Sequence, residues 1–71
     1  MRNKNDYYQE IVCFMREHNA SIAPVKTRAI ADGCEISVYM ALNYLRELHR
    51  LNIVEPNSCG KGKAIYWYLV D

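Results

Sequence analysis

The fold is decided by the stretch from Ser37 to Val54, which reads S-V-Y-M-A-L-N-Y-L-R-E-L-H-R-L-N-I-V. Ser37 can cap a helix, because its hydroxyl can accept a backbone N–H of the first turn. Asn52 can end the helix in the left-handed conformation that Gly more often supplies. At about 100° per residue, the apolar side chains between these two signals fall on one stripe that would pack on a core. The stripe consists of Val38, Ala41, Leu42, Leu45 and Leu48.

The opposite face of this predicted helix carries side chains that suit contact with DNA. Tyr, Met and Asn can contact base edges, and Arg can contact phosphates. The outward set consists of Tyr39, Met40, Asn43, Arg46, Glu47 and Arg50. We therefore interpret this helix as a candidate recognition helix, with Ser37 at its start.

Length and composition predict one globular domain over residues 1–71, with residues 1–5 frayed. Half of the residues are hydrophobic, at 51%, which argues against a disordered chain. The longest uninterrupted apolar stretch, residues 64–70, is too short to span a membrane. The N-terminal residues are followed by no apolar segment of the kind that a secretory signal needs. We expect a cytoplasmic protein.

The three cysteines, Cys13, Cys34 and Cys59, are odd in number and widely spaced. Neither a disulfide framework nor a zinc-ligand pair fits that pattern, so we expect reduced thiols, two packed and one exposed, and no metal site or cofactor. No nucleophile, base and acid occur in an arrangement that would support catalysis, and the chain is short for an enclosed substrate pocket. An enzyme is therefore not expected.

Two shorter helical patterns precede the quoted stretch. Asp6 followed by Gln9 has the spacing of a capping box and predicts a first helix over residues 6–18. A second, short helix is predicted to open at Lys26-Thr27, with Thr27 as its cap.

A tight connection joins the second predicted helix to the third. It reads Asp-Gly-Cys-Glu over residues 32–35, and Gly33 can supply a positive φ if the turn needs one. A short helix, a glycine-containing turn and a longer helix form a helix-turn-helix pattern. Many small helical hairpins share this pattern, so it is only moderately specific.

The C-terminal third predicts two strands. Residues 53–55 and 64–70 are rich in β-branched and aromatic side chains, and residues 56–63 form a hairpin tip between them. By the period of two, one face of the last strand is predicted to lie in the core, and it consists of Ile65, Trp67 and Leu69. Three helices followed by a hairpin predict an α+β fold, the winged helix-turn-helix, with the hairpin as the wing.

Basic side chains fall in three separated segments, although the net charge is only +1. A fold that brought these segments together would have a basic face for phosphate contacts. Scattered surface charges are the alternative. The candidate DNA contacts outside the recognition helix are Lys26, Thr27 and Arg28 in the second helix and Lys61 and Lys63 in the wing.

Several short motifs occur in a characteristic order. They are Ile11 with Phe14-x-x-x-His18-Asn19, Lys26-Thr27-x-x-Ile30-Ala31, Tyr39-x-Ala41-x-x-Tyr44-Leu45-x-x-Leu48, Val54, and Gly62-x-Ala64-x-Tyr66-Trp67-x-Leu69. In this order the chain after residue 6 resembles the PapI and FaeA family of fimbrial operon regulators from enteric bacteria. It departs from that family in a longer linker after Asn19, and Asn52 stands where many winged helices have Gly.

The resemblance implies a transcription regulator that binds promoter DNA together with the leucine-responsive regulatory protein. Family promoters carry GATC sites whose adenine methylation sets expression states. A module with so little net charge should bind nonspecific DNA at about 10 to 100 µM or more weakly, so a second attachment through a partner or a dimer is expected. The alternative is a winged-helix module that uses its Tyr39–Met40 surface to bind a protein and never reads bases.

Overall fold

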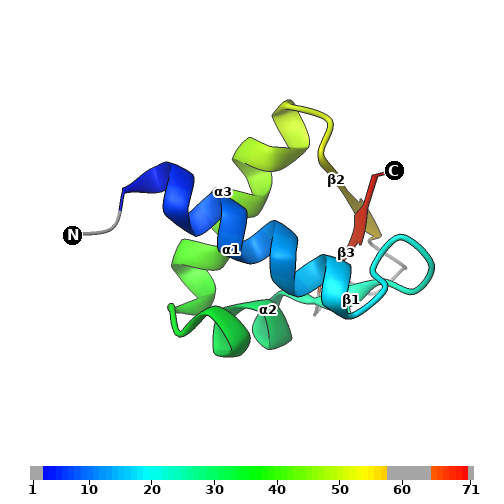
Figure 1. Ribbon diagram of the computed structural model, residues 1–71, viewed down its shortest axis with the longest axis horizontal. Coiled ribbons are helices and arrows are strands. Elements are labelled where there is room, and N and C mark those ends of the chain that lie inside the picture. Colours follow the sequence, from blue (N-terminus) through cyan, green and yellow to red (C-terminus); the bar gives the residue numbers. More distant parts are fainter. Residues whose placement is uncertain (1–2, 58–64, 71) are drawn as a thin grey trace.

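The computed structural model describes residues 3–57 and 65–70, which form three helices and a three-stranded antiparallel sheet (Figure 1). The sheet has the strand order β1-β3-β2 and lies at one end of the helical unit. In chain order the elements are α1 (Lys4–Glu17), β1 (Val25–Lys26), α2 (Thr27–Cys34), α3 (Val38–Arg50), β2 (Val54–Asn57) and β3 (Tyr66–Leu69). This architecture confirms the predicted winged helix-turn-helix.

The first helix, α1, begins at Lys4 because Asn3 caps it. The Asn3 side chain accepts the Asp6 N–H at 3.1 Å, and the Asp6 carboxylate accepts the Asn3 N–H at 3.3 Å. This reciprocal pair is a complete capping box. The prediction that Asp6 and Gln9 form the box is wrong, and residues 3–5 belong to the cap and the first turn rather than to a frayed end.

The second helix, α2, begins at Thr27, and the N-cap residue Lys26 makes no side-chain cap. The prediction that Thr27 caps α2 is wrong, because the Thr27 hydroxyl has partners in the interior. Its Oγ1 donates to the Ile65 carbonyl at 2.8 Å and accepts the indole Nε1–H of Trp67 at 2.8 Å. Thr27 is only 7% exposed. This hydroxyl therefore ties the start of α2 to β3.

Gly33 lies inside α2 and does not supply the positive φ of the following turn. A Cβ at this position would fall within 3.0 Å of three atoms of the Phe14 ring, so the glycine lets α1 approach α2 closely. Glu35 adopts the left-handed conformation instead, with φ of 59° and ψ of 44°. The predicted connection over residues 32–35 is therefore placed too early in the chain, because residues 32–34 belong to α2 and the tight turn begins at Glu35.

All three described helices end in the same way. Each is followed by a non-glycine residue with positive φ. The backbone N–H of the residue after it donates to a carbonyl in the last helical turn, as in the Schellman motif. The positive-φ residues are Asn19 (55°), Glu35 (59°) and Asn52 (62°). The long return bonds run from Ala20 to Met15 at 2.9 Å, from Ile36 to Ala31 at 3.0 Å and from Ile53 to Leu48 at 2.9 Å. The prediction for Asn52 is therefore confirmed.

The strand β2 is longer than predicted, since Pro56 and Asn57 continue it and pair with Trp67 and Tyr66 of β3. The Val70 N–H donates to the Ile53 carbonyl at 2.9 Å. Hydrogen-bonded pairs alternate along an antiparallel ladder, so Pro56 falls at a position whose N–H would point away from β3. Proline is tolerated at such an edge position because no ladder bond is lost.

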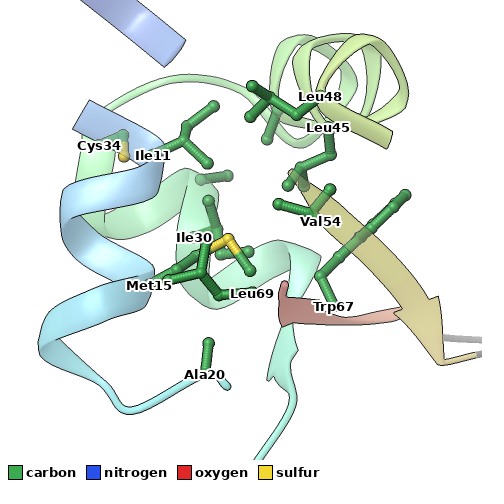
Figure 2. Close-up of a cluster of buried hydrophobic side chains, with 12 residues drawn as sticks. Ile11, Met15, Ala20, Ile30, Cys34, Leu45, Leu48, Val54, Trp67 and Leu69 are labelled. Carbon is green, nitrogen blue, oxygen red and sulfur yellow. The ribbon is translucent and has the colours of Figure 1, made fainter. Parts of the chain in front are cut away.

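Side chains from every helix and from the sheet converge on one core (Figure 2). Trp67 and Leu69 are buried and Ile65 packs against them, which confirms the predicted inner face of β3. Within the α3 stripe, Val38 is 42% exposed and is not part of the core. The buried set consists of Ile11, Met15, Ala20, Ile30, Ala31, Cys34, Ala41, Leu45, Leu48, Val54, Trp67 and Leu69.

The two cysteines that the structure describes differ in burial, one packed and one exposed. Cys34 is buried in the core and Cys13 is exposed on α1. Cys59 lies outside the described residues.

The Thr27 hydroxyl can be tested by removing it at nearly constant volume. Thr27→Val leaves the buried indole N–H of Trp67 without its acceptor, so we expect the free energy of unfolding to fall by about 1–3 kcal/mol. Thr27→Ser keeps the hydroxyl and should lose less than Thr27→Val. Denaturant titration followed by Trp fluorescence measures both, and equal losses in the two variants would contradict the assigned role.

The left-handed residue after α2 offers a stabilising change. Glu35 pays the steric cost of a side chain at positive φ, which glycine avoids. We expect Glu35→Gly to raise the free energy of unfolding by about 0.5–1 kcal/mol, with a higher melting temperature. Glu17→Gly, in the last turn of α1, is the control and should lower the stability. A destabilised Glu35→Gly protein would show that the Glu35 side chain makes a compensating contact.

Candidate nucleic-acid interface

The start of α3 is fixed by Ser37. Its Oγ accepts the Met40 N–H at 3.0 Å, so the predicted cap is present. Because Ser37 Oγ acts as the acceptor in this bond, its hydroxyl proton can still be donated to an outside partner such as a phosphate oxygen. The cap thus places a small donor at the point where the exposed face of α3 begins.

The exposed face of α3 carries the side chains that the helical period predicted. Tyr39 is 75% exposed, and Asn43 and Arg46 are also exposed, while Met40 is half-buried. Within residues 3–57 and 65–70, neither Asn43 nor Arg46 is hydrogen-bonded through its side chain. An amide and a guanidinium that have no protein partner can bond to an approaching ligand.

Arg50 differs from Arg46 in having an acidic neighbour. Its Nη1 lies 3.4 Å from the Glu47 Oε2, with side-chain exposures of 76% for Arg50 and 49% for Glu47. Exposed helical ion pairs three or four residues apart contribute about 0.2–0.5 kcal/mol and are weakened by salt. The pair therefore restricts Arg50 only slightly.

An aromatic cluster holds α3 against α1. The Tyr44 ring stacks on the Tyr7 ring, with centroids 5.2 Å apart and an interplanar angle of 14°. The Tyr44 ring also packs against the Tyr8 ring in a T-shaped pair, with centroids 5.6 Å apart and an interplanar angle of 83°. In the sequence, Tyr44 belongs to the motif of the third predicted helix, and the motif indicates no partner for its ring. The contacts of Tyr44 with Tyr7 and Tyr8 depend on how α1 and α3 cross, and no local sequence pattern reveals that crossing.

The remaining candidate residues divide into three groups. Lys26 and Arg28 are exposed at the start of α2, which packs on α3. Thr27, between them, is buried and hydrogen-bonded in the core, so it is not part of an exposed interface. Lys61 and Lys63 lie outside the described residues.

Within residues 3–57 and 65–70 no helix is long and apolar enough to cross a membrane. The same residues contain no group of three or more His, Cys, Asp or Glu side chains placed to hold a metal. A largely apolar groove of about 550 Å³ lies between α1 and the end of α3, and its lining includes Val12, Leu51 and Ile53.

Solved structures identify the architecture as that of a winged-helix protein. The zinc-responsive MarR family member ZitR of Lactococcus lactis superimposes with a TM-score of 0.72 over 92% of this chain, at 14% identity. Wild-type ZitR in complex with DNA superimposes with a TM-score of 0.67 over 90% of this chain, at 18% identity. The match spans 42% of the ZitR chain in each case, and at these identities it shows the fold alone.

The family model of the FaeA-like proteins matches residues 7–71, and the chain belongs to that family. Two Escherichia coli proteins are related at 33% identity over 60 residues: the P fimbrial regulatory protein KS71A and the major pilus subunit operon regulatory protein. Each alignment covers 84% of this chain and 73% of the relative. The resemblance drawn from the motifs is confirmed.

The aromatic cluster leads to a prediction about the position of α3. Tyr44→Ala removes the stack on Tyr7 and the edge contact with Tyr8, and we expect it to lower the free energy of unfolding by about 2 kcal/mol. Tyr44→Phe keeps both ring contacts and should cost less than about 0.5 kcal/mol. Thermal denaturation by circular dichroism measures both. Tyr39→Ala, at an exposed position of the same helix, is the control and should leave the melting temperature nearly unchanged.

Proposed function

We propose that this chain is a DNA-binding transcription regulator of a fimbrial operon and that it inserts α3 into the major groove. The observation that carries the proposal is the exposed polar face of α3 on a winged-helix scaffold. Family membership supports the biological role, because both related E. coli proteins are named as regulators of fimbriae or pili.

Each side chain on this face has a chemical role in the proposal. Asn43 pairs in bidentate fashion with N6 and N7 of an adenine. Tyr39 and Met40 contact base edges, including thymine methyl groups. Arg46 and Arg50 bind phosphates or the O6 and N7 acceptors of guanine.

Residues beside α3 would supply contacts to the sugar-phosphate backbone. Ser37 donates its hydroxyl proton to a phosphate, while Lys26 and Arg28 approach the backbone from the start of α2. Lys61 and Lys63 are proposed to extend these contacts from the wing. Contacts of this kind set the register of the protein on the duplex without reading its sequence.

The proposal includes a protein partner on the DNA. With a net charge of +1, the chain has little long-range attraction to DNA, and about six basic contacts give weak binding at physiological salt. A second attachment raises avidity by roughly a hundredfold or more. We propose that the leucine-responsive regulatory protein provides it, at GATC sites whose methylation state controls binding.

The role of Asn43 gives the test. On a fimbrial promoter duplex, Asn43→Ala should lose about 1–3 kcal/mol of binding free energy, because one bidentate base contact disappears. On a scrambled duplex of equal length it should lose almost nothing. Fluorescence anisotropy at two salt concentrations, with and without the leucine-responsive regulatory protein, measures both affinities. Asn5→Ala, an exposed asparagine on α1, is the matched control and should behave as wild type.

The outcomes separate the candidate functions. Equal losses on the two duplexes would remove Asn43 from the set of base-reading residues. A wild-type chain that binds no duplex in a salt-dependent way, with or without the partner, would favour the protein-interaction module that uses Tyr39 and Met40.

A further inference from the structure

A carboxylate lies within the proposed recognition face. Glu47 follows Asn43 by four residues and precedes Arg50 by three, and residues at these spacings are neighbours on one helical surface. It is the single acidic residue of α3, which reads VYMALNYLRELHR. Its side chain is 49% exposed, so the charge faces solvent, and in the proposed complex it faces DNA.

Stability does not account for this carboxylate. Its ion pair with Arg50 is long, at 3.4 Å, exposed and open to screening by salt. Toward DNA the charge is unfavourable, because every duplex presents phosphates. A residue that contributes little to the fold and weakens binding to DNA in general can still increase the difference in affinity between two DNA sequences.

We propose that Glu47 is a specificity-determining residue, which rests on the proposed DNA-binding function. In the major groove the hydrogen-bond donors are amino groups, N4 of cytosine and N6 of adenine. A carboxylate is an acceptor only, so it can be satisfied by these groups and by no other base edge. Glu47 therefore accepts a hydrogen bond from a base amino group at the preferred site. It disfavours a duplex that has no amino group at that position.

The pair with Arg50 strengthens this discrimination. While Glu47 has no base partner, its carboxylate stays beside the Arg50 guanidinium and offsets part of the positive charge. When Glu47 turns to an amino group, Arg50 becomes free for a phosphate. Because the pair is weak, this exchange costs less than the new contact provides.

The test compares Glu47→Gln with wild type on two duplexes. One is selected from a randomised library by the wild-type chain, and the other is its scrambled counterpart. Removal of a like charge should tighten binding to the scrambled duplex about 3- to 10-fold, and the slope of log affinity against log salt should steepen by up to about one. On the selected duplex the same relief of repulsion is offset, because the neutral Gln amide accepts a weaker hydrogen bond from the amino group than the carboxylate does, so the affinity should change less than about twofold.

Glu17→Gln is the matched control, because it makes the same charge change at an exposed position of α1. Melting temperatures near wild type establish that both variants are folded. An unchanged affinity of Glu47→Gln for the scrambled duplex, or an equal gain in Glu17→Gln, would overturn the inference while leaving the proposed function intact. A wild-type chain that selects no duplex, either alone or together with the leucine-responsive regulatory protein, would overturn the proposed function and this inference together.

Discussion

The Thr27 hydroxyl is the contact on which the arrangement of helices and sheet depends. It accepts the indole proton of Trp67 and donates its own proton to the carbonyl of Ile65, both at 2.8 Å. Since Thr27 is the first residue of α2, its hydroxyl joins the sheet to the helical unit at the edge of the shared core. Because α2 packs on α3, the same contact helps to set where the exposed face of α3 lies relative to β3.

Much of the fold could be predicted from the sequence, because its signals are local. Ser37 and Asn52 mark the ends of α3 within a few residues of the bonds they make, and the helical period separates the buried Leu45 from the exposed Asn43. Thr27 shows where local reasoning fails. A threonine ahead of a helix resembles a cap, but its partner Trp67 is 40 residues away in the chain. No local sequence pattern indicates that the Thr27 hydroxyl will bond to Trp67 instead of capping α2.

In the candidate site, too, features set by the local sequence could be predicted and features set by contacts between distant segments could not. The exposed side chains of α3 could be predicted from spacing alone, whereas the stack of Tyr44 on Tyr7 requires the crossing of α1 over α3. Likewise, Gly33 was expected to serve the turn, but its lack of a side chain is needed for the approach of Phe14. Both misses concern contacts between helices, where sequence separation hides spatial proximity.

Pro56 has a consequence for the behaviour of many copies held close together. It lies within the outer strand β2, where its missing N–H would have pointed away from the sheet. An open strand edge is a template for pairing with a neighbouring chain, and one lost donor interrupts that template. The opposite edge strand, β1, is only two residues long. The sheet is therefore poorly suited to edge-to-edge aggregation, even when molecules crowd onto a short length of DNA.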